Sequence, residues 1–392
     1  MFSFVVAGAG LTGAVVARLI AEELGQNVLV VEKRTHIGGN CYDEIDEAGI
    51  LVHRYGPHIF HTDSRGVFQF LSRFTRWREY RHRVLGVIDG KKVPVPFNLN
   101  SLHALFPQGL ASMMEGELLK EYEYGATVHI GRLLAHGNQH IASLGKYIYE
   151  KIFLNYSKKQ WGSAFKALDD GVLARVPVKV SRDDSYFEDR YQAIPVHGYT
   201  TVIRNILDHR NIRLLLNTPA AEIMDVDPEN KTMTLFERPY SGVLVYTGSP
   251  DELFQRKFGP LPYRAIRFEF ESLYWTSRFQ ETATVNYPNN YDFTRITEFR
   301  HLHPSFSPHT TILREYPVDF TDSSPGLVPS YPIPTDEARK HHNQYAGLAR
   351  SVSGLFLAGR LGNYRYYDMA DAIEAAMKCF EEIRRHVVAS GS

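Results

Sequence analysis

The sequence has few cysteines, no net charge and no long apolar run. Its 392 residues include two cysteines, too few for a disulfide framework and not placed at a metal-ligand spacing, which favours a reducing cytoplasm and predicts no metal site. Lys and Arg number 44 together, as do Asp and Glu, so no global field favours nucleic acid or an anionic membrane. No stretch of 18 apolar residues occurs, and we expect no transmembrane helix.

The first residues present the clearest pattern. Residues 2–7 are apolar, as in a strand buried on both faces, and a Gly-x-Gly-x-x-Gly motif follows at 8–13. Residues 14–24 have helical composition, and 27–31 form a second apolar run that ends at Glu32. The early glycines argue against a signal peptide. This order predicts a βαβ unit with a right-handed crossover.

The motif gains meaning from this context. Its glycines allow a pyrophosphate to approach the backbone at the positive end of a helix. Glu32 lies 19 residues beyond Gly13, where ribose recognition places an acid, and it would repel the 2′-phosphate of NADP. The competing interpretation is a tight strand–helix turn without a ligand. It does not explain why the preceding strand, the following helix and the acid at the end of the second strand occur together.

Two further segments favour FAD over NAD. Gly38-Gly39-Asn40 follows the acid, as in large FAD-binding folds, and Leu355 to Arg360 reads as a strand ending in Ala-Gly and a charge. A last helix from Met369 would direct its positive end at the flavin N1–C2 carbonyl and favour the anionic reduced form. The expected cofactor-binding residues are Gly8, Gly10, Thr12, Gly13, Glu32, Lys33, Gly39, Asn40, His58, Arg360, Asp368 and Met369.

The rest of the chain divides by pattern. Residues 66–144 read as a mostly helical insertion, with helices at 67–74 and 109–122 joined by a proline-rich segment at 93–98. Another helix is expected within 143–161, short strands within 214–245, and antiparallel strands within 263–315. At 392 residues, two or three domains are expected.

Several motifs outside the nucleotide-binding segments carry a family resemblance that runs nearly end to end. They are Tyr55 to Thr62 (YGPHIFHT), Tyr156 to Gly162 (YSKKQWG), Ala174 to Pro177 (ARVP), Tyr186-Phe187 with Asp189, Thr294 to Ile296 (TRI) and Gly359 to Tyr366 (GRLGNYRY). By these motifs the chain resembles bacterial UDP-galactopyranose mutases.

The resemblance implies an α/β fold with a Rossmann-like FAD-binding domain built from discontinuous segments, a helical domain and an antiparallel-sheet substrate domain. The expected ranges are 1–66, 191–246 and 346–392 for the first, 67–144 for the second, and 145–190 with 247–345 for the third. It also implies a homodimer and a mobile loop around Trp161 that closes over substrate.

The implied activity is that of an isomerase, which interconverts UDP-galactopyranose and UDP-galactofuranose. N5 of the reduced flavin attacks the sugar C1 with no net redox change, so NAD(P)H or a reductase is needed only for priming. Galactofuranose for a bacterial surface polysaccharide is the implied product.

The resemblance also assigns site residues. Arg175 and Arg295 match the paired arginines that hold the pyrophosphate, as forked donors can. Arg360, Tyr331 and Tyr366 match further phosphate ligands. His58 and His61 flank the flavin, and with the two arginines they form the expected catalytic group. The uridine end is matched by Phe153, Tyr156, Trp161, Tyr186 and Asn286.

The sequence leaves the exact substrate open. Tyr367 and Ala370 depart from the residues usual in the family beside the flavin and sugar, so the same mechanism on dTDP-fucopyranose or UDP-N-acetylgalactopyranose stays an alternative. His61 argues against the N-acetyl sugar. A flavin oxidoreductase of the amine oxidase type would share the FAD motifs but would not explain Arg175 and Arg295. A non-catalytic protein of the Rab-dissociation-inhibitor type would lack flavin.

Overall fold

The computed structural model describes residues 2–167, 177–321 and 326–390. Its nucleotide-binding part is a five-stranded parallel sheet in the order β12-β2-β1-β16-β22. The strands are β1 (Phe4–Ala7), β2 (Val28–Val31), β12 (Ile212–Leu215), β16 (Val243–Tyr246) and β22 (Leu355–Leu357). They come from three distant stretches of chain, as expected for a Rossmann-like domain assembled from separate segments.

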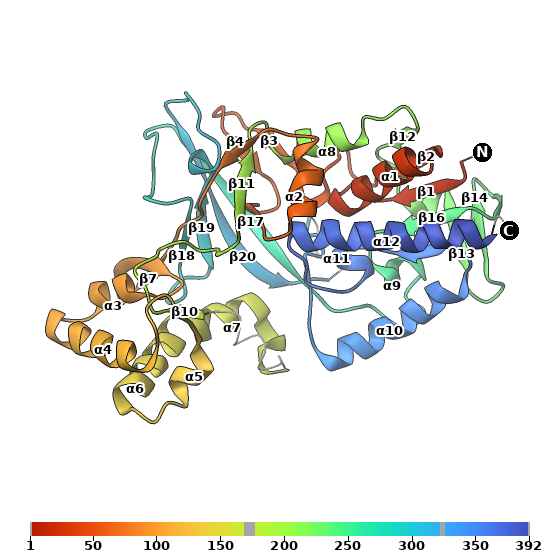
Figure 1. Ribbon diagram of the computed structural model, residues 1–392. Coiled ribbons are helices and arrows are strands. Elements are labelled where there is room, and N and C mark those ends of the chain that lie inside the picture. The colour runs from red at the N-terminus through yellow and green to blue at the C-terminus, as the bar shows by residue number, and fades with distance from the viewer. Residues whose placement is uncertain (1, 168–176, 322–325, 391–392) are drawn as a thin grey trace.

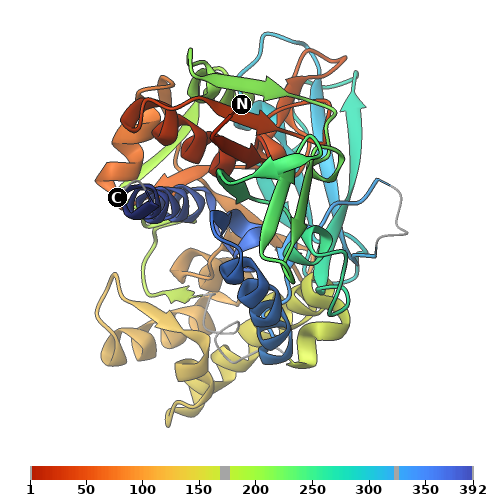
Figure 2. The same ribbon diagram turned by 90° about the vertical axis from the view of Figure 1, so that its right-hand side faces the viewer.

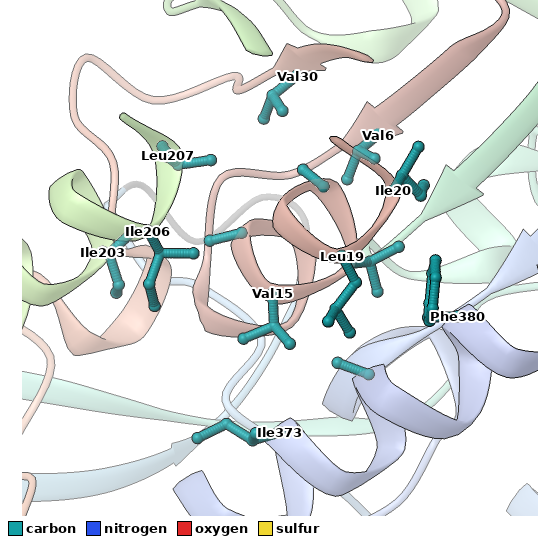
Figure 3. Close-up of a cluster of buried hydrophobic side chains, with 14 of the residues drawn as sticks. Val6, Val15, Leu19, Ile20, Val30, Ile203, Ile206, Leu207, Ile373 and Phe380 are labelled. Carbon is teal, nitrogen blue, oxygen red and sulfur yellow. The ribbon is translucent and has the colours of Figure 1, made fainter. Parts of the chain in front are cut away.

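Helices cover one face of this sheet. The helices are α1 (Leu11–Glu23), α2 (Arg65–Ser72), α8 (Tyr199–Leu207) and α12 (Met369–Ser390). Figure 3 shows Val15 and Ile20 of α1 between Ile203 of α8 and Phe380 of α12, all four buried. The apolar face of α1 is thus enclosed on several sides, which fixes its N-terminus over the sheet edge.

The opposite face carries a small antiparallel sheet and one long helix. The sheet is β13 (Met224–Asp227), β14 (Thr232–Leu235) and β15 (Arg238–Tyr240), and the helix is α10 (Asp336–Ser351). Val5, Leu29 and Leu244 of the parallel sheet pack with Leu235 and Tyr345 in one core. Burial on both faces explains why the parallel strands are continuously apolar.

A seven-stranded sheet forms the second half of the molecule, with order β21-β17-β20-β19-β18-β7-β8. Its strands are β7 (Val84–Ile88), β8 (Lys91–Val95), β17 (Tyr263–Leu273), β18 (Thr284–Asn286), β19 (Arg295–Glu298), β20 (Thr310–Asp319) and β21 (Tyr331–Pro332). All neighbours are antiparallel except β18 and β7. The antiparallel strands expected within 263–315 are therefore confirmed.

Residues 84–95 were expected to belong to a mostly helical insertion, and this expectation is wrong. They form the hairpin β7–β8 at the edge of the large sheet. Buried and partly buried positions alternate along β7, the period of a strand packed on one face. Pro94 is tolerated because β8 is an edge strand, where a missing N–H costs no ladder bond.

Helices dominate residues 99–161, which lie at the lower left and bottom centre in Figure 1 and at the bottom in Figure 2. They are α3 (Leu99–Leu105), α4 (Gln108–Glu121), α5 (Ile130–Leu134), α6 (Gln139–Ile148), a π-helix (Tyr149–Leu154) and α7 (Asn155–Trp161). The strands β9 (Thr127–His129) and β10 (Pro177–Lys179) pair beside them. These elements share a core of their own that includes Leu102, Leu118 and Ile148.

Short elements join the two halves. They are the hairpin β3 (Asp43–Ile45) and β4 (Leu51–His53), the sheet β5 (Phe60–Thr62), β11 (Tyr191–Pro195) and β6 (Trp77–Glu79), and the helices α9 (Pro250–Leu253) and α11 (Gly359–Gly362). Within the described residues, no helix combines the length and the apolar character needed to cross a bilayer.

Candidate active site

One cavity of about 750 Å³ extends from the carboxyl ends of β1 and β2 to the large sheet. Every site residue predicted above lines it, with one exception. The exception is Arg175, which lies in 168–176, outside the described residues. The structure thus brings the expected cofactor and substrate residues together in one space, although their segments are far apart in the sequence.

The glycine loop forms one end of the cavity. Gly8 follows β1 with φ +114°, a conformation that other residues rarely adopt. A Cβ on Gly13 would lie 2.0 Å from the carbonyl oxygen of Gly8, so only glycine allows α1 to approach the strand this closely. No side chain caps the start of α1. Its first N–H groups remain available to an anion at the positive end of the helix.

Glu32 is held at the end of β2 by the backbone. Its side chain is buried, and its two oxygens accept the N–H groups of Ala9 at 2.8 Å and Arg34 at 2.9 Å. Each carboxylate oxygen has a second lone pair, which suits a ribose hydroxyl. The neighbouring Lys33 also lines the cavity, and its ammonium pairs with Glu252 at 3.1 Å.

Arg34 is a site residue that the sequence analysis missed. Its guanidinium lies 4.4 Å from the ring centre of Tyr55 and donates to Asn40, while Nη1 is buried without a hydrogen-bond partner among the described residues. Its position two residues after the acid was the only signal in the sequence, and that signal does not distinguish a cavity residue from a surface one.

Arg295 on β19 provides a cation at the other end of the cavity. Its Nε lies 2.8 Å from Oε1 of Glu315, whose side chain is 1% exposed. The pair is electrostatic, because these two atoms do not meet hydrogen-bond geometry. Burial opposes the charge of Arg295, but Glu315 raises its pKa above the usual value. Glu315 was also missed, since the partner of a strand residue depends on register.

Arg360 stands beside two stacked phenols. Its guanidinium carbon lies 5.3 Å from the ring of Tyr331 and 5.6 Å from the ring of Tyr366, and these rings are 5.8 Å apart and nearly parallel. Arg360 donates to the carbonyls of Ser330 and Tyr367. No carboxylate pairs with it among the described residues, so its charge is available to an anion in the cavity.

Aromatic side chains surround the far end. Phe153 lies on the π-helix, Tyr156 and Trp161 on α7, and Tyr186 follows β10, with Phe153 and Trp161 buried. Asn286 of β18 joins them, and its Oδ1 is buried without a partner among the described residues. A planar heterocycle with an N–H donor would satisfy that oxygen and stack on a ring.

Two histidines, His58 and His61, lie between these ends. Burial lowers the pKa of His58 to about 4, with Arg360 adding to the effect, so its imidazole is neutral at pH 7. His61 stacks on Phe187 with ring centres 3.6 Å apart, and its Nδ1 lies 3.0 Å from a carboxylate oxygen of Asp189.

Asp368 lies beside His61 and at the start of α12, whose positive end is expected to act on the flavin. Its carboxylate lies 4.0 Å from Nε2 of His61 and accepts the N–H of Asp371 in the first turn of α12. Burial raises the pKa of Asp368. The positive end of α12, expected to act on the flavin, is therefore partly satisfied by a side chain of the protein itself.

Comparison with known proteins agrees with this geometry. A family model described as UDP-galactopyranose mutase matches residues 151–366, and a model described as an NAD(P)-binding Rossmann-like domain matches residues 6–74. The UDP-galactopyranose mutase of Mycoplasma pneumoniae is 32% identical over 388 residues, covering 97% of this chain and 96% of that protein. The dTDP-fucopyranose mutase of Escherichia coli is 32% identical over 383 residues, covering 97% of each.

Solved structures show the same architecture. A crystal structure of reduced UDP-galactopyranose mutase aligns with a TM-score of 0.74 at 16% identity, covering 98% of this chain and 96% of that one. A putative protoporphyrinogen oxidase from Exiguobacterium aligns with a TM-score of 0.63 at 13% identity, covering 97% and 98%. The nearly full-length relatives and the family model together show that this chain is an enzyme of the UDP-galactopyranose mutase family, a family of isomerases.

Proposed function

We propose that this protein interconverts the pyranose and furanose forms of a UDP-linked galactose, with reduced FAD as its cofactor. The observation that carries the proposal is the continuity of the cavity. A dinucleotide loop occupies one end, while Arg295, Arg360 and an aromatic cluster occupy the rest. A nucleotide sugar bound at the second end would place its sugar against a flavin bound from the first.

The residues at the loop fit a flavin dinucleotide. A Cβ on Gly13 would fill the space where α1 approaches the backbone, and Glu32 is fixed where a ribose would lie. Gly38 and Gly39 form a second glycine turn that bridges back to Gly10. When bound and reduced, FAD would supply the nucleophile for the anomeric carbon, so that the bond from sugar to phosphate breaks and re-forms without net redox change.

The chain's own residues hold the leaving group. Arg295 and Arg360 would bind the diphosphate, which must stay in place while the sugar ring opens and closes. The phenols of Tyr331 and Tyr366 flank Arg360 and would exclude water from the phosphates. Arg175 is proposed as the second member of the arginine pair on its sequence motif.

The aromatic end would bind the nucleoside. Its rings offer a stacking surface, and the unpaired Oδ1 of Asn286 offers an acceptor for a base N–H. Trp161, expected in a mobile loop, is the last residue of α7, is 7% exposed and lines this end of the cavity.

Protons at the sugar would be handled by the histidine region. His58 is neutral and can only accept at its cavity-facing nitrogen, because its Nδ1 donates to the carbonyl of Gly56 at 2.8 Å. His61, between the carboxylates of Asp189 and Asp368, is the group placed to carry a proton.

The direct test is conversion of the nucleotide sugar. The purified protein is incubated with UDP-galactopyranose, with and without dithionite, and the products are separated by chromatography. UDP-galactofuranose formed only under reduction is the expected result. A bound, reduced flavin without conversion would refute the galactose assignment and leave the family assignment intact.

The same assay decides between substrates. The dTDP-fucopyranose mutase is 32% identical to this chain, as is the Mycoplasma pneumoniae UDP-galactopyranose mutase, so dTDP-fucopyranose is the second candidate and UDP-N-acetylgalactopyranose the third. A flavin oxidoreductase would instead consume reducing equivalents in proportion to an organic substrate.

The remaining proposals concern the setting of the enzyme. Both cysteines are buried and unpaired, which supports a reducing cytoplasm and priming by NAD(P)H or a reductase.

Exposed apolar side chains at Leu110, Met113 and Leu119 of α4 support a homodimer formed through the helical part. Light scattering on the purified holoenzyme tests the second point, and a monomer would contradict it.

A further inference from the structure

Three histidines form a chain behind the cavity wall. His53 ends β4 with no exposed surface, and His303 follows the short helix at 299–301. Their Nε2 atoms are 3.0 Å apart. On its other side, Nδ1 of His53 lies 3.0 Å from the backbone nitrogen of His58, which lines the cavity.

This geometry fixes the tautomers. A backbone N–H can only donate, so Nδ1 of His53 accepts and the ring proton of His53 is on Nε2. That proton is donated to Nε2 of His303, whose own proton is consequently on Nδ1. The chain therefore has a defined direction, with its donor end at the peptide N–H of His58 and its acceptor end at His303.

A metal ion is the rival explanation for this cluster. The carboxylate of Asp43 lies within 4.8 Å of both ring nitrogens, and all three residues are buried. A ligating Nε2 needs a free lone pair, whereas His53 carries its proton there. The two oxygens of Asp43 accept the N–H groups of Tyr199 and Thr200 at the start of α8, which accounts for its burial without an ion. The cluster is thus a hydrogen-bond chain rather than a ligand set.

The surroundings keep the chain uncharged. Burial lowers the pKa of His53 well below its usual range, and the neighbouring imidazoles add to this. Burial also lowers the pKa of His303 to about 4, with the guanidinium of Arg78 adding. A second proton on His53 would be on Nδ1, where it would face the N–H of His58, and a second proton on His303 would be on Nε2, where it would face the N–H of His53. Either proton would therefore break one bond of the chain.

The chain determines what His58 presents to the cavity. Its backbone is held by His53, and its Nδ1 donates to the carbonyl of Gly56 at 2.8 Å. Its Nε2 therefore has a lone pair and no hydrogen-bond partner among the residues that the structure describes. Arg360 and Arg295 are the charged groups that act on this ring from the cavity side.

We propose that His53, whose tautomer is set by the peptide N–H of His58 and whose Nε2–H is bonded to His303, is a positioning residue that holds His58 as an obligate hydrogen-bond acceptor toward the flavin. The proposal rests on the proposed function for the identity of the group in the cavity. An acceptor favours the reduced flavin, which carries one more ring N–H than the oxidised form. His53 would therefore help to keep the cofactor in the state that the isomerase reaction needs.

The first test concerns the tautomers and does not depend on the activity. Two-dimensional ¹⁵N NMR of histidine-labelled protein, assigned through single substitutions, reports which ring nitrogen carries each proton. We expect Nε2–H for His53, Nδ1–H for His58 and His303, and no second proton on them between about pH 8 and about pH 6. A proton on Nδ1 of His53, or a charged His53 near neutral pH, would overturn the proposal even where FAD and catalysis are confirmed.

The second test separates positioning from structural support in the FAD-loaded enzyme. His53→Asn places an amide oxygen near the former Nδ1 and keeps the acceptor, whereas His53→Leu removes it. We expect His53→Leu to make the midpoint potential of the bound flavin more negative and His53→Asn to leave it close to wild type. His103→Leu, which removes a histidine paired with Glu115 in the helical part, is the matched control.

Equal potentials for His53→Leu and wild type would overturn the role of His53, as would an equal shift in both His53 variants. If His53→Leu does not fold, His303→Gln and His303→Leu make the same comparison, because only glutamine retains an acceptor at the end of the chain. A protein that binds no FAD contradicts the proposed function, while the NMR result still decides the tautomers.

Discussion

Arg295 and Glu315 face each other across the antiparallel pair β19–β20, as register partners whose side chains meet at 2.8 Å. Glu315 is 1% exposed and Arg295 is 27% exposed on the side of the cavity. The buried carboxylate therefore fixes a guanidinium that still has donors to offer. A phosphate bound in the cavity would meet a cation that is already oriented, which reduces the entropy lost on binding.

Arg295→Ala is expected to abolish most turnover while FAD stays bound. Losing a charge-assisted contact to a buried phosphate costs about 2–4 kcal/mol, which corresponds to roughly 30- to 1000-fold in kcat/KM. Arg314→Ala is the control. Arg314 is the residue before Glu315 on β20, but it pairs with Glu269 and Glu271 instead. Steady-state kinetics and flavin absorbance measure both effects, and near-wild-type turnover in Arg295→Ala would refute its role.

Glu315→Ala tests the other partner through stability. Removing one member of a buried pair leaves an uncompensated charge, and the lower end of the usual cost, about 3 kcal/mol, applies because Arg295 is partly exposed. We expect a lower unfolding free energy by denaturant titration and a smaller loss in the presence of UDP, whose phosphates would neutralise Arg295. A stability loss that UDP does not reduce would contradict phosphate binding there.

Gly13→Ala should impair folding and cofactor binding together. The new methyl group would lie 2.0 Å from the carbonyl oxygen of Gly8, and overpacking of this kind costs about 1–3 kcal/mol. The matched control is Gly116→Ala on the exposed face of α4, where no atom lies within 4 Å and the helix should gain about 0.5–1 kcal/mol. Thermal denaturation and the FAD content of the purified variants decide the outcome. A Gly13→Ala protein with full FAD content would show that the loop does not bind the cofactor.

Asn286→Leu is expected to weaken nucleotide binding rather than folding. The Oδ1 of Asn286 has no partner among the described residues, so its hydrogen bond is available to the ligand. Losing it should raise the Kd for UDP by roughly 5- to 150-fold, from about 1–3 kcal/mol. Asn289→Ala is the control, since Asn289 bonds Asn155 and the carbonyl of Lys151 outside the cavity. An unchanged Kd in calorimetric titration would remove Asn286 from the nucleoside site.

The local parts of the fold were predictable because their signals are local. The apolar strand, the glycine motif, the helix and Glu32 follow one another within 32 residues, and the structure has them as β1, α1 and β2. The hairpin at 84–95 differs from the prediction because Pro94 and Pro96 are typical of a connecting loop, whereas Pro94 lies in the edge strand β8. Burial alternates along β7, but its sequence Val-Leu-Gly-Val-Ile is apolar throughout, so this period is visible only in the structure.

Site residues that belong to sequence motifs could be predicted, whereas those brought in by strand register or tertiary packing could not. The sequence motifs led to the residues of the cavity, but Glu315 and His303 were missed. Glu315 reaches Arg295 through strand pairing, and His303 reaches His53 across 250 positions of the chain. Partners of this kind depend on how distant segments pack, which neither spacing nor composition records.

Lys159 gives the last prediction, because it joins the two halves of the substrate site. It lies on α7 between Tyr156 and Trp161, and its ammonium donates to the backbone carbonyls of the hairpin between β18 and β19, including Phe293 at 2.9 Å. Burial lowers the pKa of Lys159 to about 8, although Asp292 opposes this.

The folded protein therefore releases this proton at a lower pH than the unfolded chain, where the pKa of a lysine is about 10.4. Between these two values the unfolded state binds more protons, so the contribution of Lys159 to stability rises with pH across that window. Compared with Lys159→Met, wild type should gain relative thermal stability from about pH 8 to about pH 10, by a modest amount because the amine is only half-buried. Lys158→Met, at the exposed neighbouring position, should show no such trend. A stability difference between wild type and Lys159→Met that is constant or falls over this range would show that the ammonium of Lys159 is not buried against the hairpin.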